Sequence, residues 1–283
     1  MFIIRKFEED KTMADGAAKS DDSGVGALFR AGRLDDAIAA ATAKVKSSPS
    51  DLSARVLLAE LLVFAGNIER ADVLLDAAGQ LDPSASIVVA EFRQLLRAET
   101  ARRQLYRDGR VPEFLGGPGD VETALLAALV ALRDGDAEAA RRAAETAEAG
   151  RGARAGTADG SAFADFRDAS DICGGIFEVL TTTGKYFWIP ISRVTEVTFH
   201  PPERPRDLIW RRATLAVHDG PDGDVYMPVT YAAGDASLAP EFRLGRATDW
   251  IEQGGLVTGV GQREFLVGEA AVPVMELGEI VFS

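Results

Sequence analysis

The stretch FRAGRLDDAIAAATAKVKSSP, residues 29–49, has a counterpart in VFAGNIERADVLLDAAGQLDP, residues 63–83. The two stretches carry the same residues 34 positions apart, at Gly32 and Gly66, at Ala37 and Ala71, and at Pro49 and Pro83. In each stretch the glycine can make a turn between two helices, the small alanine allows a close helix contact, and the proline suits the start of the next unit. Internal repetition at this period predicts stacked pairs of helices.

This pattern resembles the tetratricopeptide repeat, a helix-turn-helix unit of about 34 residues. The resemblance covers residues 18–51 and 52–85, and a degenerate third unit covers residues 121–154. The alternative is an Ala-rich array of helical hairpins that belongs to no particular family, because so short a motif also recurs by accident. Both interpretations predict stacked helix pairs over residues 24–150.

Between the second and third units, the segment Ser86–Asp108 departs from the repeat but keeps a helical stripe of apolar residues. We expect one long helix there. Glu99, Arg102 and Arg103 fall on its polar side, and their spacing predicts a solvated network of ion pairs. Residues 109–119 are rich in Gly and Pro, so they end the helix.

The composition changes after residue 150. Residues 151–164 are rich in Gly, Ala, Arg and Asp without a periodic pattern, which predicts a linker. In residues 165–283, β-branched and aromatic residues replace Ala and Leu, which predicts a mainly antiparallel β domain, either a meander or a small barrel-like sheet. The expected fold class is therefore α+β. The strands are expected at residues 176–181, 185–189, 194–200, 214–218, 225–229, 261–268 and 272–282.

Composition limits the class of protein. The formal net charge of −13 over 283 residues argues against nucleic-acid binding, which draws its energy from cation–phosphate contacts. Cys173 is the only cysteine, so no internal disulfide can form, and a reducing, cytoplasmic location fits. No run approaches the roughly 18 apolar residues that a membrane span needs, so we expect no membrane insertion. Residues 1–23 are expected to be disordered, with Met13 as an alternative start to Met1.

The segment HPPERPRDLIWRR, residues 200–212, differs most from generic packing. Pro201 and Pro202 should end an apolar run and set a rigid corner. Several arginines then surround Asp207 and Trp210, and a guanidinium group can both pair with a carboxylate and stack on an aromatic ring. The segment is either a recognition corner that binds a partner or a surface corner that an Arg–Asp bridge and a half-buried Trp hold in place.

No catalytic, metal or cofactor site stands out in the sequence. The aspartates of residues 219–224 lack the spacing and the final Glu of a calcium loop. Gly259-Val-Gly261 lacks the third glycine and the strand-to-helix context of a dinucleotide fingerprint. The two histidines have no metal-ligand spacing with Cys173, for which an inert thiol is expected. We therefore predict a protein that is not an enzyme and that has no metal or cofactor.

Several longer motifs carry a family resemblance. In the helical half these are the repeats and RDGRVPEFLGGP (107–118). In the second half they are GTADGSAFADFRDASD (156–171), FEVLTTTGKYFWIPISRV (177–194), PPERPRDLIWR (201–211), LGRATDW (244–250) and GVGQREFLVG (259–268). From about residue 25 onward the chain resembles the ImpE family, also called TagJ or SciE-type proteins. One departure is that the acidic cluster 168–171 is followed by Ile172, where the family has a further acid and a base.

The resemblance implies a non-enzymatic, cytoplasmic adaptor of bacterial type VI secretion. Such an adaptor binds the N-terminal helix of the small subunit of the contractile sheath. In some systems it connects that subunit to the AAA+ ATPase ClpV, which disassembles the sheath. Arg and Trp concentrate binding energy in interfaces. The candidate protein-binding site therefore consists of Trp188, Arg206, Asp207, Trp210, Arg211, Arg246, Asp249, Trp250, Gln262 and Arg263.

Three alternatives stay open. Part of this set could form an internal Arg–Asp–Trp network that only holds the sheet together. The helical array could be a generic tetratricopeptide scaffold for another partner, with residues 156–283 as a stabilising cap. The sheet domain could instead hold an enzyme site for an anion or phosphate ester, in which case Arg204, Arg206 or Arg246 should converge with an acid in a deep pocket.

Overall fold

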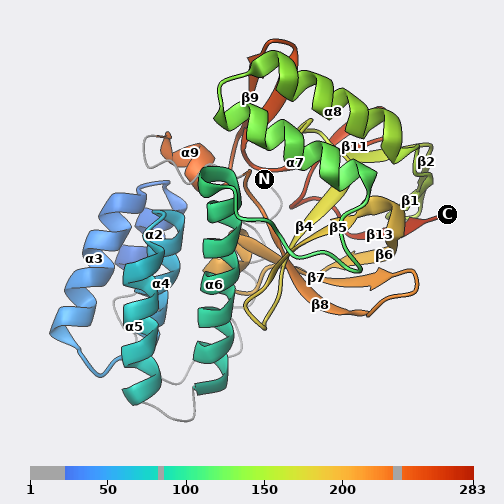
Figure 1. Cartoon of the computed structure of the whole chain (residues 1–283). Helices are drawn as coiled ribbons and strands as arrows, with labels where there is room; N and C mark the ends of the chain where they lie inside the picture. Colours follow the sequence, from blue (N-terminus) through green and yellow to red (C-terminus); the bar gives the residue numbers. More distant parts are fainter. Residues whose placement is uncertain (1–22, 82–85, 232–237) are drawn as a thin grey trace.

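The computed structural model describes residues 23–81, 86–231 and 238–283. A helical part comes first in the chain and a part built mainly from strands follows it (Figure 1). This order confirms the predicted α+β fold class. The segment for which we predicted disorder lies outside the described residues, together with both candidate start methionines, except for Ser23, which begins the first described helix.

Most helices of the first part form pairs joined by short turns. They are α2 (Ser23–Arg30), α3 (Leu34–Ser47), α4 (Leu52–Phe64), α5 (Ile68–Leu81), α6 (Ser86–Asp108), α7 (Asp120–Arg133) and α8 (Ala137–Arg151). The turns of three pairs hold Gly32, Gly66 and Gly135, whose φ angles are 79°, 78° and 77°. This left-handed region favours glycine, because a side chain there meets the backbone. The repeat glycines therefore have the role that the sequence predicts.

The repeat alanines lie at the contacts between helices. Ala37, Ala71 and Ala140 have no exposed surface. Because the distance between packed helices depends on the side chains at the contact, a methyl group permits close approach. These features confirm the predicted tetratricopeptide-like array.

Helix α6 joins the array to the strands. It is one continuous helix over Ser86–Asp108, as the apolar stripe predicts. It packs against α5 and also against β4 (Ile176–Leu180) and β5 (Tyr186–Pro190), and Figure 1 shows it standing between the other helices and the sheet. The side of α6 that carries Glu99 and Arg102 therefore faces protein rather than water.

The main sheet is antiparallel and has the strand order β2-β1-β13-β6-β7-β8-β4-β5. Its other strands are β1 (Gly156–Ala158), β2 (Ser161–Phe163), β6 (Val194–Phe199), β7 (Trp210–Val217), β8 (Gly223–Pro228) and β13 (Glu279–Phe282). The edge strands β2 and β5 do not pair with each other, so the sheet is open and the barrel-like closure that we predicted is wrong. Glu113 occupies the edge of β5 instead, through backbone hydrogen bonds with Tyr186 and Trp188.

Smaller elements complete the second part. They are β3 (Phe166–Asp168), β9 (Thr248–Gln253), β10 (Leu256–Gly261), β11 (Glu264–Val267), β12 (Ala270–Pro273), the 3₁₀ turns η3 (Ile191–Arg193) and η4 (Pro205–Leu208), and the short helix α9 (Pro240–Arg243). Residues 151–164, for which we predicted a linker, include β1 and β2. β1 and β2 form a local hairpin around Asp159-Gly160, a turn signal that our prediction missed, and β1 also pairs with β13, far along the chain.

Three hydrophobic clusters lie in the described residues, and the smallest joins α7 and α8 to β10 through Ala128, Ala140 and Leu256. The largest cluster includes Leu58 and Phe92 from the helices and Trp188 and Trp210 from the strands. The second lies within the strand part and includes Phe177. The helical array and the main sheet therefore share one core rather than meeting at a polar interface.

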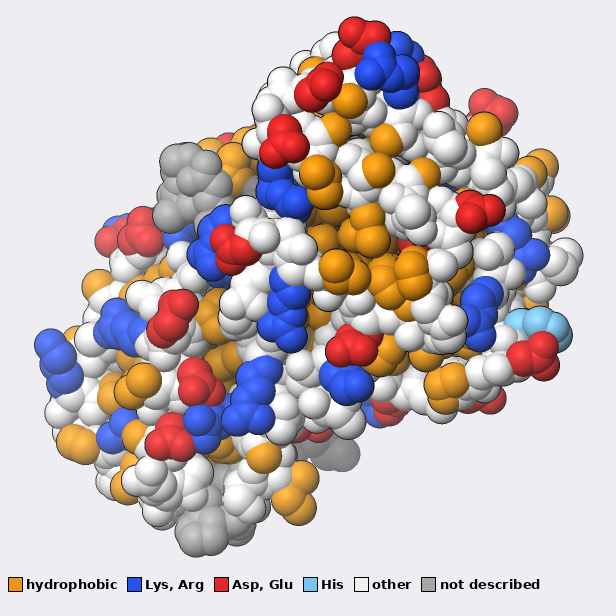
Figure 2. All heavy atoms as spheres, in the orientation of Figure 1, with side chains coloured by type: hydrophobic (Ala, Val, Ile, Leu, Met, Phe, Trp, Pro, Cys, Tyr) orange, Lys and Arg blue, Asp and Glu red, His pale blue; other side chains and the backbone are white. Residues whose placement is uncertain are grey.

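The visible surface is mixed in character. Figure 2 shows acidic and basic side chains interspersed on this face, with hydrophobic side chains gathered where the segment between α6 and α7 crosses the sheet. Within the described ranges, none of the helices has the length and apolarity that crossing a membrane requires.

Candidate functional site

The corner at residues 200–212 is shaped by its own carboxylate. β6 ends at Phe199, directly before this corner. The Asp207 carboxylate accepts hydrogen bonds from the backbone N–H groups of Glu203 at 2.9 Å and of Arg204 at 3.1 Å. A carboxylate in this position satisfies donors that the start of a helical turn leaves unpaired. Asp207 is buried and stabilises η4, so its side chain is not available to a partner.

Arg206 extends from this corner toward the helical array. Its Nη2 donates to Glu91 Oε1 of α6 at 2.8 Å, and its guanidinium group lies 5.3 Å from the centroid of the Phe92 ring. The Tyr226 hydroxyl also donates to Glu91, at 2.8 Å. Nε and Nη1 of Arg206 are buried and have no hydrogen-bond partner among the described residues. Arg206 therefore anchors the corner to α6 and leaves two donors unsatisfied.

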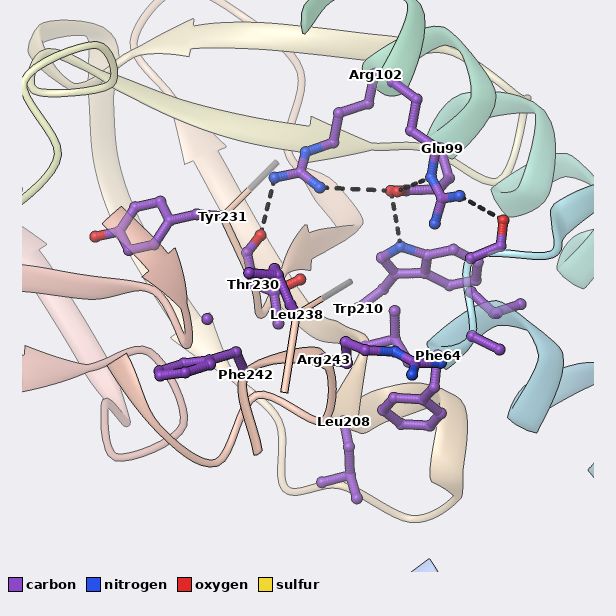
Figure 3. A pocket seen from close by; sticks show the side chains of 16 residues that line it. Phe64, Glu99, Arg102, Leu208, Trp210, Thr230, Tyr231, Leu238, Phe242 and Arg243 are labelled. Carbon is purple, nitrogen blue, oxygen red and sulfur yellow. Dashed lines mark hydrogen bonds and ion pairs between the residues drawn. The ribbon is translucent and has the colours of Figure 1, made fainter. Parts of the chain in front are cut away.

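Trp210 makes a second connection to α6. Its Nε1 donates to Glu99 at 3.2 Å. Its ring packs edge-on against the Phe92 ring, with the two centroids 6.1 Å apart and the ring planes at 79°. Glu99 also accepts from Arg103 at 2.9 Å, and Figure 3 shows Arg102 and Trp210 pointing toward the same carboxylate. The prediction of a solvated network is wrong for Glu99 and Arg102, which are both buried because the strands cover this side of α6.

The Glu178 carboxylate of β4 is the centre of a larger buried network. It accepts hydrogen bonds from Arg102 Nε at 2.9 Å and Nη2 at 3.1 Å, and it pairs with Arg263. The hydroxyls of Tyr106 and Tyr186 also donate to it. Burial alone would raise the pKa of Glu178, but the two guanidinium groups and the hydrogen bonds lower it to about 2. Glu178 is therefore charged at neutral pH.

Trp188 and Arg263 are members of the same network. Trp188 Nε1 donates to the Tyr186 hydroxyl at 2.6 Å, and Arg263 also pairs with Asp168. Asp168 belongs to the acidic cluster 168–171, and Asp171 of that cluster accepts a hydrogen bond from a backbone N–H of β10 at 2.8 Å. These acids connect strands inside the protein.

Arg211 lies in β7, and its side chain reaches another part of the strand region. Its Nη1 donates to the carbonyl of Val274, its Nε donates to the carbonyl of His200 at 3.3 Å, and its guanidinium group lies 4.9 Å from the centroid of the Phe199 ring. Burial lowers the pKa of Arg211 to about 10. Arg211 therefore holds two loops against the sheet.

Asp249 and Trp250 lie at the surface on β9. The Asp249 carboxylate accepts the backbone N–H of Trp250 at 2.8 Å. The Trp250 side chain is 38% exposed, and its ring centroid lies 5.8 Å from that of the Tyr231 ring. Neighbouring Ile251 is 46% exposed, and it points to the opposite face of β9, because successive side chains of a strand alternate.

The structure thus separates the candidate residues instead of joining them in one surface. The internal-network alternative describes Trp188, Arg206, Asp207, Trp210, Arg211 and Arg263, which are all buried. The other candidates are Arg246, Asp249, Trp250 and Gln262. For these residues, which have exposed surface, a role in protein binding stays a prediction.

Arg246 and Gln262 border an apolar groove of about 420 Å³ between α2 and the corner. Its lining consists of Gly26, Phe29, Arg30, Pro202, Arg204, Pro205, Leu208, Val229, Leu244, Gly245, Arg246, Gln262 and Met275. Arg246 donates to the carbonyls of Phe29 at 2.8 Å and Arg30 at 3.0 Å, so it fastens the end of α2 to the strand part. No sequence signal identifies this groove, because its apolar residues come from separate segments.

The charged residues that line the groove in the described ranges are all arginines. Arg30 and Arg204 both line it, and neither guanidinium group has a hydrogen bond or ion pair with another residue that the structure describes. No Asp or Glu is among the described residues that line it. In a chain with a net charge of −13, this is a local excess of positive charge around an apolar floor.

The pocket in Figure 3 is a different space, enclosed between α4, α6 and the strands. Glu99, Arg102 and Trp210 line it, and its volume is about 40 Å³. This volume admits only a few water molecules, since each needs roughly 10–15 Å³ of such space. The pocket therefore serves the buried network and is too small for an organic ligand.

The anion-site alternative requires Arg204, Arg206 or Arg246 to converge with an acid in a deep pocket. Arg204 and Arg246 both border the groove, whereas Arg206 points to α6, and no acid converges with them in the described lining. Cys173 is buried, and burial raises the pKa of its thiol to about 12. A thiol with this pKa is protonated at neutral pH and is a poor nucleophile.

Comparison with known proteins places the chain in a family. A family profile described as ImpE protein matches residues 160–281, and one described as tetratricopeptide repeat matches residues 28–96. The type VI secretion system accessory component TagJ of Pseudomonas aeruginosa is 33% identical over 256 residues, which cover 90% of each chain.

A solved structure is also similar. The crystal structure of protein VPA1032 from Vibrio parahaemolyticus superimposes with a TM-score of 0.86 and 27% sequence identity. The match covers 92% of this chain and 97% of that one, so both the helical array and the strand part are shared. With the profile match and the full-length similarity to TagJ, the chain belongs to the ImpE/TagJ family.

Proposed function

We propose that this protein is a non-enzymatic, cytoplasmic accessory component of a bacterial type VI secretion system. We further propose that it binds the N-terminal helix of the sheath small subunit and connects that subunit to the ATPase ClpV. The similarity to TagJ over 90% of both chains supports the accessory role. The tetratricopeptide-like array supports a role in binding other proteins.

The apolar groove between α2 and the corner is the observation that carries the proposal. Phe29, Leu208 and Leu244 offer an apolar surface of the kind that receives one face of an amphipathic helix. Arg30 and Arg204 add positive charge and form no ion pair with a described carboxylate, although the charge of Arg204 also acts on the buried Glu60. The groove therefore suits a helix that carries acidic residues beside its apolar face.

The inner side of the repeat array is a poorer candidate. η4 packs against α4, and β4 and β5 pack against α6, so the chain's own strand part covers this side. A generic tetratricopeptide scaffold would need that side free for its partner. Removal of residues 156–283 would also expose the shared core, so truncation cannot separate a scaffold from a cap.

The connection to ClpV requires a surface that the helix does not cover. β9 offers Trp250, which is exposed and does not line the groove. β9 already pairs with β10, and the Asp249 carboxylate accepts the Trp250 N–H. We therefore assign the predicted roles of Asp249 and Trp250 to a side-chain contact at this second surface.

The test is a calorimetric titration of the full chain with a peptide of the N-terminal helix of its own sheath small subunit, at low and high salt. We expect saturable binding with a negative heat-capacity change, because apolar surface is buried. Leu208→Ala combined with Arg204→Ala should weaken binding at least about tenfold. Trp250→Ala is the matched control and should leave peptide binding unchanged.

Absence of binding at both salt concentrations, with a folded protein, would remove the sheath-subunit proposal. Full binding by the folded groove variant with loss in Trp250→Ala would move the site to β9. A melting curve for each variant establishes that it is folded.

A further inference from the structure

A second cavity, of about 530 Å³, shares no lining residue with the apolar groove. It lies among the segment Leu115–Gly119, the beginning of α7, the end of α8 and the turn η3. Figure 1 shows these ends of α7 and α8 beside β1 and β2. The cavity contains part of the motif RDGRVPEFLGGP, to which the proposed function assigns no role.

Arginines provide most of the charge in this cavity. Arg151 pairs with Glu148 at 2.8 Å and with Asp165 at 2.5 Å, so its charge is balanced. Arg154 and Arg193 also line the cavity, and neither makes an ion pair with a carboxylate in the described ranges. Neither guanidinium group is therefore paired with a carboxylate side chain of the described residues.

Backbone carbonyls are the hydrogen-bond partners of these two arginines. Arg154 donates to the carbonyl of Ser283 at 3.3 Å and to that of Val194 at 3.2 Å, and Arg193 Nη1 donates to the carbonyl of Leu115. These bonds hold the two side chains in place. Nε and Nη2 of Arg193 have no hydrogen-bond partner within the described chain. Neither atom is fully buried, so both donors are accessible to a ligand.

Two acids also line the cavity, and neither forms an ion pair with Arg154 or Arg193. Glu122 accepts the backbone N–H of Gly119 at 2.8 Å and is buried, so it serves the start of α7. Asp120 is exposed at the rim. Around Gly116 and Gly117 there is open space, with no atom within 4 Å of where a Cβ would stand, so a ligand can approach the backbone there.

We propose that this cavity binds a small oxyanionic ligand, whose phosphate or carboxylate groups Arg154 and Arg193 hold. Guanidinium groups offer paired N–H donors that match the geometry of both kinds of oxyanion. The volume lies in the range of about 300–1,000 Å³ that is typical of small-molecule sites. Because the cavity is separate from the groove, this inference does not depend on the binding of a sheath helix.

The test uses the full chain in a chloride buffer of constant ionic strength, titrated with inorganic pyrophosphate and, separately, with citrate. We expect saturable calorimetric binding of at least one probe in the millimolar range or tighter. Arg193→Gln should weaken it at least tenfold, and Arg193→Lys should weaken it less because the charge remains. Arg212→Gln is the matched control, since Arg212 pairs with Asp224 at the surface outside this cavity.

Binding of pyrophosphate alone assigns the site to phosphate ligands, and binding of citrate alone assigns it to carboxylates. The proposal would be overturned if neither probe gave a saturable calorimetric titration. It would also be overturned if Arg212→Gln weakened binding as much as Arg193→Gln does. Arg154→Gln loses contacts to Val194 and Ser283 and can unfold locally. For that variant, hydrogen exchange of residues 115–119 with and without the probe provides the readout, and the variant should lose the protection that the probe gives the native chain.

Discussion

The Arg102 guanidinium group of α6 donates two hydrogen bonds to the Glu178 carboxylate of β4, across 76 positions of the sequence. The side chain of Arg102 is 3% exposed and that of Glu178 is fully buried. Two desolvated charges are stable together only when their remaining donors and acceptors are satisfied. Arg263 and two tyrosines supply those partners, so this pair sets how the helical array sits on the sheet.

Replacement of Glu178 by Gln should lower the free energy of unfolding by about 3–5 kcal/mol, because Arg102 and Arg263 would stay buried without their shared counter-charge. Urea denaturation at neutral pH measures the change. Glu145→Gln is the control: its exposed pair with Arg141 is of the kind that contributes at most about 1 kcal/mol. A loss for Glu178→Gln no larger than that of the control would contradict the central role of this carboxylate.

Acid should destabilise the protein through the same carboxylate. The pKa of Glu178 is about 2 in the folded protein, below the value of about 4.3 for an unfolded chain. A lowered folded pKa gives stability that is present above the unfolded value and is lost as the pH falls toward the folded value. Denaturation curves between about pH 5 and pH 2 should therefore show a steeper loss for the native chain than for Glu178→Gln.

Glu60 of α4 should give the opposite pH dependence. Burial raises the pKa of Glu60 to about 7, although Arg206 opposes the shift. A raised folded pKa gives stability that is present below the unfolded value of about 4.3 and is lost as the pH rises through 7. Between about pH 5 and pH 8 the native chain should lose stability relative to Glu60→Gln. Equal pH profiles for the two proteins would show that Glu60 does not titrate in this range.

Trp210→Ala should cost about 3–5 kcal/mol, the usual loss for an aromatic side chain removed from a core. Trp210 packs on Phe92 and donates to Glu99, so the helical array and the sheet both lose contacts. We expect helix content and aromatic fluorescence to report one coincident unfolding transition, because the two parts share a core. Two separate transitions in the native chain would disprove that coupling; Trp250→Ala, at the surface, is the stability control.

Gly259→Ala should destabilise the protein by about 1–3 kcal/mol through overpacking. A Cβ at Gly259 would stand 2.1 Å from the ring of Tyr231, whose hydroxyl donates to Asp168. Gly223→Ala, where nothing lies within 4 Å of the added Cβ, is the control. Equal melting temperatures for the two variants would show that Tyr231 moves freely. Gly259 and Gly261 of the motif GVGQREFLVG are thus required by close packing.

Local sequence predicts much of the fold because its causes are local. The 34-residue period, the turn glycine Gly66 and the small Ala71 determine a helix pair within a few residues of chain. The strands that follow the change of composition, such as Ile176–Leu180, likewise carry β-branched and aromatic residues. In contrast, the pairing of β1 (Gly156–Ala158) with β13 joins the two ends of the strand part, and no property of neighbouring residues predicts it.

The candidate site was less predictable. Arg and Trp are frequent both in interfaces and in buried networks, so residue type alone cannot say whether Trp188 or Trp210 faces a partner or the core. Burial depends on which surface covers each side of α6, and that surface is built from residues about a hundred positions away. The apolar groove has the same property, since Phe29 and Met275 come from opposite ends of the chain.

The sequence by itself determined the helical repeats, the change to strands and the family, because periodicity, turn residues and long motifs are properties of neighbouring residues. Only the tertiary structure decided that the sheet is open, that Glu99 and Arg102 are buried, and that arginines from distant segments line two separate cavities. These features depend on contacts between distant segments. The free energy of a buried charge depends on its desolvation and on its pairing, and both depend on the groups that surround it in the folded protein.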